Sequence, residues 1–267
     1  MVRAIFGAIL FFTVISNAQE FNRSPIILTS KSETSKNIIE LTKKVTVPVY
    51  DGDKLLDLLN KTTDEEEMLS ETLDSEFAHR APPDFDDKIM DIVTGQHELS
   101  PIAQYIAEPG DGDPLYTKIN RSLRSGKKLS KGLADFVAKF EGALDKIPSV
   151  HALSYRGAIY SKKVTSAYLP GSTLAEKGYF STSVSLSVAK KFLVNNDGRS
   201  GKPVLYVIYG ENGKSISQIN PEYQGEAEIL YRKNTNFCVT GRSTPATKEE
   251  VLIVLLREVK TDCSELN

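Results

Sequence analysis

Two glutamates, Glu226 and Glu228, stand two residues apart in the sequence YQGEAEIL, in what otherwise looks like a buried strand. Side chains two apart in a strand point to the same face, so these carboxylates would lie roughly 6 to 7 Å apart and repel each other. Paired glutamates in strands commonly form a solvated face. A fixed carboxylate can also stabilise a positive charge that develops in a transition state, as in glycoside hydrolysis.

Two further polar groups interrupt the strand patterns of the second half of the chain. Arg156 lies in the middle of one predicted strand, where burial of a guanidinium is costly unless it meets an anion. Ser181, Thr182 and Ser183 end another predicted strand, in FSTS. Taken singly, each has an ordinary explanation, because strand arginines are usually half-exposed or salt-bridged and a Ser-Thr-Ser run usually caps a helix.

Taken in order, with aromatic residues before the first two, the arginine, Ser-Thr-Ser and Glu-x-Glu motifs resemble the arginine-serine-glutamate class of mono-ADP-ribosyltransferases, which includes bacterial toxins. The resemblance covers about residues 98–240. Besides EYQGEAEIL it includes three quoted segments: the helix text YTKINRSLRSG at 116–126, SYRG at 154–157 and GYFSTS at 178–183.

The resemblance implies an α+β fold in which N-terminal helices pack on a two-sheet β core, with a cleft that binds NAD as substrate. Arg156 is then expected to grip the phosphates. Ser181 is expected to hydrogen-bond Glu228 and fix its rotamer. Glu228 is expected to accept a hydrogen bond from the nicotinamide ribose and to stabilise the positive charge left when nicotinamide departs.

The same resemblance implies an acceptor side of the cleft. Glu226 is expected to orient and deprotonate the acceptor, and in this class a glutamate at that position goes with arginine acceptors. Tyr223 and Gln224, in the turn at 220–225, are expected to contact the acceptor protein. The implied partner is a host protein with an acceptor arginine, with actin or a small GTPase suggested by analogy alone.

Further NAD contacts are expected from Thr182 and Ser183, and from Tyr179 or Phe180 beside nicotinamide. Strand alternation requires that one of these two aromatic residues face the core. Two residues after Ser-Thr-Ser are additional candidates for phosphate and nicotinamide contacts, namely Phe192 and Arg199. Helix packing for the first and simple solvation for the second remain open.

The composition gives no support for nucleic-acid binding or for a metal site. The formal net charge of −2 over 267 residues provides no basic field for nucleic acid. The three histidines His79, His97 and His151 are scattered without ligand spacing, so we expect no metal site. Cys238 and Cys263 could form one disulfide, but the sequence does not supply their geometry.

The N-terminal residues 1–18 combine Arg3 with an apolar run and small residues before Gln19, which predicts a signal peptide and a secreted protein. No other stretch predicts a membrane span. Residues 19–84 are polar and weakly periodic, so we expect a solvated helical arm or linker there. Residues 85–267 form the predicted catalytic domain, with helices up to Pro148 and short strands after it, interrupted by one helix.

Three functions are compatible with these motifs. The first is a secreted arginine-specific transferase, more similar to bacterial toxins than to the cysteine-richer vertebrate enzymes of the class. The second is an NAD glycohydrolase, in which water replaces the acceptor in the same site. The third is a non-catalytic binding module on the same scaffold, which the presence of all three motifs disfavours.

Overall fold

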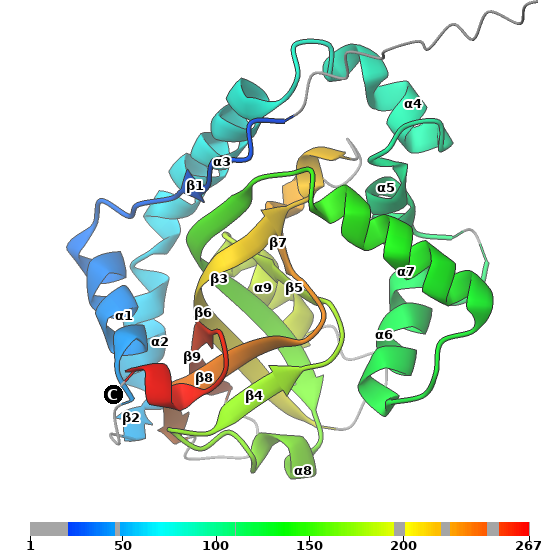
Figure 1. Cartoon of the computed structure of the whole chain (residues 1–267). Coiled ribbons are helices and arrows are strands. Elements are labelled where there is room, and N and C mark those ends of the chain that lie inside the picture. Colours follow the sequence, from blue (N-terminus) through cyan, green and yellow to red (C-terminus); the bar gives the residue numbers. More distant parts are fainter. Residues whose placement is uncertain are drawn as a thin grey trace, which may run out of the picture.

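The computed structural model describes residues 21–45, 49–109, 111–194, 201–219, 225–244 and 251–266 (Figure 1). The predicted signal peptide at 1–18 lies outside these residues. Helices precede strands along most of the chain, as the sequence predicts, and no helix among the described residues is long and apolar enough to cross a membrane.

The helical half contains α4 (Ile89–Thr94), α5 (Ser100–Ile106), α6 (Leu115–Ser125) and α7 (Lys131–Leu144). Their boundaries follow from local chemistry. Pro101 occupies the first turn of α5, Gly126 ends α6 with a φ of 69°, and the Ser130 hydroxyl accepts a hydrogen bond from the Leu133 N–H at the start of α7. The helices predicted from periodicity are therefore confirmed.

The strand half matches the predicted runs. It contains β3 (Ser149–Tyr160), β5 (Phe180–Ser183), β6 (Lys202–Ser215), β7 (Glu228–Tyr231), β8 (Thr235–Thr244) and β9 (Leu252–Val259), with α9 (Leu186–Val194) as the single predicted helix between them. The sequence did not predict β4 (Thr173–Glu176) or the short helix α8 (Lys162–Thr165).

Strand pairing joins the nine strands of the described residues in one network, so hydrogen bonding alone does not divide them into the two sheets of the expected core. The order is β1-β3-β5-β7-β6-β9-β8-β2, with β4 on β8 and an additional pairing of β3 with β6. Because β3 pairs with both β5 and β6, and β7 also pairs with both, these four strands close into a ring. The ring brings the end of β5 beside the start of β7.

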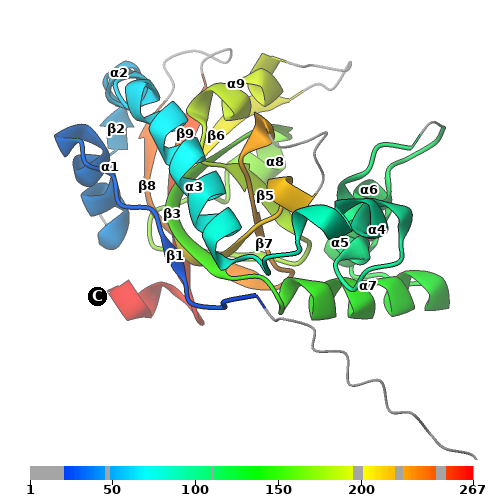
Figure 2. The same ribbon diagram turned by 90° about the horizontal axis from the view of Figure 1, so that it is seen from above.

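The segment before residue 85 is helical, but it is not the solvated arm that we expected. Two short strands, β1 (Ile26–Ile27) and β2 (Val49–Asp51), extend the sheet at β3 and β8. Three helices follow the sheet surface: α1 (Glu33–Lys43), α2 (Gly52–Asn60) and α3 (Glu66–Arg80). Figure 2 shows α1 and α2 on the side of the strands opposite to α4–α7.

Sparse apolar residues explain why this polar segment packs so closely. Ile38 and Leu59 are fully buried and Leu55 nearly so, in a cluster that includes Leu205 and Leu255 of the sheet. Leu55 and Leu59 lie four residues apart and therefore on one helical face. A few apolar residues on one face are sufficient for docking, whereas average polarity suggests solvation.

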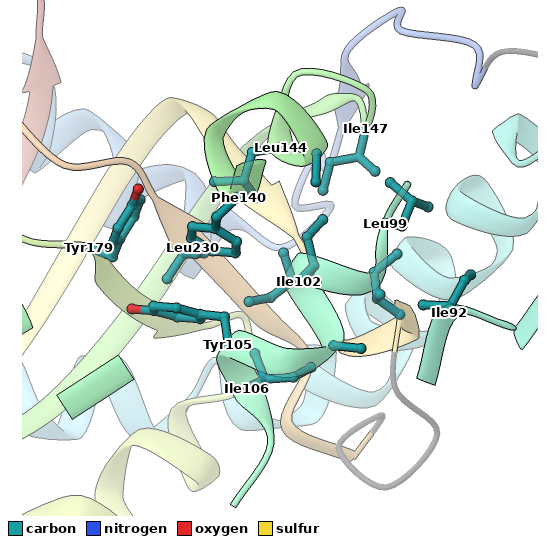
Figure 3. Packing of buried hydrophobic residues seen from close by; sticks show 14 of the residues in the cluster. Ile92, Leu99, Ile102, Tyr105, Ile106, Phe140, Leu144, Ile147, Tyr179 and Leu230 are labelled. Carbon is teal, nitrogen blue, oxygen red and sulfur yellow. The ribbon is translucent and has the colours of Figure 1, made fainter. Parts of the chain in front are cut away.

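A second core lies between the helices and the sheet. Figure 3 shows the rings of Tyr105, Phe140 and Tyr179 gathered beside Leu230 of β7. The ring centres of Tyr105 and Phe140 are 4.4 Å apart, and those of Phe140 and Tyr179 are 4.9 Å apart. This core fixes α5 and α7 against β5 and β7, the strands that carry the predicted motifs.

The two cysteines form a disulfide. Cys238 of β8 is bonded to Cys263, in the short helix Cys263–Leu266 near the C-terminus. The bond fastens this helix to the sheet, which the sequence left open.

Candidate active site

Arg156, Ser181 and Glu228 come together on three neighbouring strands. In the register of the sheet, Tyr155 of β3 pairs with Ser183 of β5, which in turn pairs with Glu228 of β7. The Ser181 side chain hydrogen-bonds the Glu228 carboxyl group. A guanidinium nitrogen of Arg156, Nη1, donates to the Ser181 backbone oxygen at 2.7 Å. The contact expected between Ser181 and the second glutamate is therefore present.

The Arg156 guanidinium is held mainly by uncharged groups. It lies 5.0 Å from the centre of the Phe180 ring and hydrogen-bonds the Tyr160 side chain. Its Nε atom is buried and has no hydrogen-bond partner among the described residues. A buried donor without a partner is costly, and an anionic ligand would satisfy it.

Glu228 combines burial with a fixed position. Its residue is 8% exposed, and burial raises the pKa of its carboxyl group to about 7, against the lowering effects of the Ser181 hydrogen bond and of Arg156. Its backbone N–H donates to the hydroxyl of Ser217, in the short helix Ser217–Ile219. Glu228 is therefore fixed by one hydrogen bond to its side chain and by another from its backbone N–H.

Glu226 and Glu228 do not share a strand face, contrary to the simple alternation that we first considered. Strand β7 begins at Glu228, and Ala227 has a φ of 43°, in the left-handed region. This conformation is uncommon for a residue with a Cβ and costs about 1–2 kcal/mol. It turns the chain so that Glu226 is exposed while Glu228 is buried.

The surroundings of Glu226 are acidic. Partial burial raises the pKa of the Glu226 carboxyl group and the charge of Glu108 adds to this effect, whereas Lys191 opposes it. Glu108 accepts a hydrogen bond from the hydroxyl of Tyr116 at 2.8 Å. An exposed carboxylate with a second acidic group nearby favours a cationic group over an anionic one.

The Ser-Thr-Ser motif divides between the two faces of β5. The Thr182 hydroxyl is buried and donates to the backbone oxygen of Ile229 at 2.8 Å. Alternation turns the Thr182 side chain away from Ser181, so its hydroxyl is engaged in the sheet, and NAD binding by Thr182 stays a prediction. The Ser183 hydroxyl donates to the backbone oxygen of Glu226 at 2.6 Å and accepts from the Ser185 N–H. It therefore connects the backbone of Glu226 to the residue that precedes α9.

Tyr179 and Phe180, the two candidates for a contact with nicotinamide, are both buried. Each residue is only 1% exposed. Tyr179 packs in the helical core, and its hydroxyl donates to Glu141 at 2.7 Å. Phe180 packs against Tyr206 and Phe237 in the core inside the sheet. Alternation places the two rings in two different cores, not in one core and one cleft.

Three residues that the sequence did not single out hold the entrance to β5. Asn120 of α6 accepts the Tyr179 N–H at 2.7 Å, and one helical turn later Arg124 donates to the Tyr179 backbone oxygen at 3.1 Å. Arg124 also forms an ion pair with Glu176 at 2.9 Å. The sequence YTKINRSLRSG places Asn120 and Arg124 four residues apart, on one helical face, and this spacing could have indicated that both contact the same strand.

The remaining predicted residues are only partly described. Phe192 is 51% exposed on α9, which excludes burial in the core as its role. Tyr223, Gln224 and Arg199 lie outside the described residues. No group of three or more potential metal ligands lies together in the described parts of the chain.

Comparisons with known proteins agree with this geometry. A family model described as ADP-ribosyltransferase exoenzyme matches residues 88–260. The chain is 30% identical over 127 residues to the NAD(+)–protein-arginine ADP-ribosyltransferase Tre1 of Serratia proteamaculans, which covers 48% of this chain and 26% of Tre1. Its match to the Vis protein of Vibrio splendidus covers 53% of that protein. The chain thus spans only part of the curated relatives that it matches.

Solved structures share the fold. The crystal structure of Vis toxin from Vibrio splendidus superposes with a TM-score of 0.56 at 21% identity, covering 74% of this chain and 86% of the other. The ADP-ribosyltransferase HopU1 of Pseudomonas syringae gives 0.52 at 18% identity, covering 70% and 87%. Because the family model matches well over half of the sequence and includes every strand of the site, the chain belongs to the ADP-ribosyltransferase exoenzyme family.

Proposed function

We propose that the chain is a mono-ADP-ribosyltransferase of the arginine-serine-glutamate class that transfers ADP-ribose from NAD to an arginine side chain of a protein. Enzymes of its family use NAD as their substrate. The observation that carries the proposal is the meeting of Arg156, Ser181 and Glu228 on adjacent strands, with the glutamate hydrogen-bonded to the serine. A buried carboxyl group beside a partly buried guanidinium matches a substrate with a developing cation and a phosphate group.

In this reaction the glycosidic bond between ribose and nicotinamide breaks, and its electron pair leaves with nicotinamide. Arg156 binds the phosphates, and its unpartnered Nε is one available donor. Glu228 accepts a hydrogen bond from the nicotinamide ribose and stabilises the oxocarbenium-like charge on the sugar. Removing one preorganised partner of this kind costs about 3–4 kcal/mol in activation free energy in other enzymes.

The acceptor binds at Glu226. A guanidinium nitrogen attacks the sugar carbon that nicotinamide has left, and Glu226 takes the proton that this nitrogen releases. The exposed position of Glu226 and the nearby Glu108 favour a cationic acceptor. Vis has been crystallised with agmatine, a small guanidinium compound, which supports the same acceptor chemistry here. Tyr223 and Gln224 remain our candidates for contacts with the acceptor protein.

Hydrolysis of NAD is a second activity of the same site. Glu226 is exposed, so water can reach the position that the acceptor nitrogen would take. We therefore expect slow NAD glycohydrolase activity without an acceptor. A purely binding role is disfavoured, because it would not explain why Glu228 is buried at a cost and held by Ser181.

The function is tested by incubating the full chain with labelled NAD and agmatine, and then with a cell lysate, followed by mass spectrometry of the labelled products. We expect nicotinamide release, ADP-ribosyl-agmatine and a host protein labelled on arginine. Glu228→Gln should abolish all three. If the wild-type chain releases no nicotinamide under any condition, it is not an enzyme of this class.

We further propose that the protein is a secreted, toxin-like enzyme, on the basis of the signal-peptide pattern in residues 1–18. Sequencing the N-terminus of the exported protein should identify Gln19 as its first residue. Recovery of the protein only inside the producing cell, with Met1 retained, would contradict export.

A further inference from the structure

The carboxyl group of Glu66 caps α9, although Glu66 belongs to α3. Its Oε2 atom accepts a hydrogen bond from the Ser185 hydroxyl at 2.6 Å and one from the Ser187 N–H at 3.2 Å. Glu66 is 8% exposed. The first N–H groups of a helix lack partners within it, and a carboxyl group there also interacts favourably with the helix dipole. The start of α9 is thus fixed by a distant part of the chain.

From Ser185 the contacts continue to the acceptor side of the site. The Ser185 N–H donates to the Ser183 hydroxyl at 3.0 Å, and that hydroxyl donates to the backbone oxygen of Glu226 at 2.6 Å. Glu66, Ser185 and Ser183 therefore form a continuous line of hydrogen bonds from α3 to the backbone of Glu226. The next residue, Ala227, has the strained φ of 43°, a conformation that persists only where its surroundings enforce it.

The two glutamates of the Glu-x-Glu motif have different supports. Glu228 pairs with Ser183 in the sheet, but its side chain is held by Ser181 and its N–H by the Ser217 hydroxyl, and neither of these two contacts passes through Glu66. Glu226 has its backbone oxygen bound by Ser183. Loss of Glu66 should therefore disturb the acceptor side of the site more than the side that cleaves NAD.

The buried carboxyl group of Glu66 also lowers the stability of the fold. Its Oε1 atom is buried without a hydrogen-bond partner among the described residues, and Glu66 lines a small cavity with Ser35 and Tyr155. A buried carboxyl oxygen without a partner destabilises a protein, and an apolar side chain would remove this cost. A side chain that destabilises the fold but helps to position an active site is expected where function limits stability.

We propose that Glu66 is a positioning residue that fixes Glu226 through Ser185 and Ser183 and so favours transfer to the acceptor over hydrolysis. This inference rests on the proposed function. Glu66 lies before residues 88–260, the part that matches the family model. The N-terminal helices thus contribute to the chemistry of the site and do more than cover the sheet.

The test compares full-length wild type with Glu66→Ala and Glu66→Gln, using NAD and agmatine. Nicotinamide release and ADP-ribosyl-agmatine are both quantified by mass spectrometry. For Glu66→Ala we expect the ratio of transfer to hydrolysis to fall about tenfold, the usual effect of losing an outer hydrogen-bond partner. Glu66→Gln should retain most of the ratio, because its amide oxygen can still accept from the Ser185 hydroxyl.

The matched control is Glu65→Ala. Glu65 is the neighbouring carboxylate and accepts hydrogen bonds from Ser30 and Ser35, so its loss loosens the N-terminal helices without touching α9. We expect its ratio to equal that of wild type. If Glu66→Ala does not fold, Ser185→Ala removes the hydroxyl that donates to Glu66, although its backbone N–H can still donate to Ser183, and it should also lower the ratio.

An unchanged ratio in Glu66→Ala, or an equal loss of transfer and hydrolysis in Glu66→Ala and Glu65→Ala, would overturn the positioning role alone. If wild type releases no nicotinamide, the proposed function fails first and the role of Glu66 falls with it. The two failures are therefore distinguishable.

Discussion

Replacing Glu228 with glutamine should abolish activity and at the same time stabilise the protein above neutral pH. Burial raises the pKa of this carboxyl group from its ordinary 4.5 to about 7. Between these values the folded protein binds the proton more tightly than the unfolded chain, so the free energy of unfolding falls as the pH rises. Glutamine cannot ionise and is not subject to this loss.

The magnitude follows from the size of the pKa change. At about 1.4 kcal/mol for each tenfold change in proton affinity, the gap between 4.5 and about 7 is worth about 3 kcal/mol. Wild type and Glu228→Gln should be similarly stable below pH 4.5, and the variant should gain up to this amount above pH 7. For a protein of this size, 1 kcal/mol shifts the Tm by about 2–4 °C, so the gain should reach about 6–12 °C.

The assay is thermal or urea unfolding of both proteins from pH 4.5 to 8. Glu67→Gln, at an exposed position of α3, is the control and should show no gain that depends on pH. In parallel, kcat/KM for NAD in wild type should rise as the pH passes about 7, because the ionised carboxylate is the active form. A gain in Glu228→Gln that is the same at pH 5 and pH 8 would refute the view that burial destabilises the charged carboxylate.

Four further outcomes are expected. Glu226→Gln should lower transfer to agmatine at least tenfold while nicotinamide release continues, and transfer at the wild-type rate would remove its assigned role. Ser181→Ala should move the pH midpoint of nicotinamide release upward, because the Ser181 hydrogen bond lowers the pKa of the catalytic carboxyl group. Arg156→Lys should raise KM for NAD about tenfold or more, since lysine cannot reproduce the contacts of the guanidinium fork; an unchanged KM would contradict phosphate binding. Replacing both Cys238 and Cys263 by serine should lower the free energy of unfolding by about 3 kcal/mol in a denaturant titration, with little effect on kcat.

Some of the expectations failed where long-range packing overrode a local pattern. The expected solvated arm before residue 85 packs on the sheet, because a few apolar residues such as Ile38 and Leu59 are sufficient to dock each helix. Glu226 does not share a strand face with Glu228, because the backbone turns at Ala227. Contacts from neighbouring elements, such as the Ser183 hydrogen bond to Glu226, set this turn. Local sequence carries no record of such contacts.

The sequence by itself determined the order of helices and strands after residue 85, the three motifs and the family that they resemble. These depend on periodicity, turn residues and residue type, which are properties of near neighbours along the chain. Only the tertiary structure decided that Thr182, Tyr179 and Phe180 face inward and that Glu66 reaches α9 from α3. The reason is physical: which face of a strand meets a core, and which distant group fills the space beside it, depend on the packing of all the elements together.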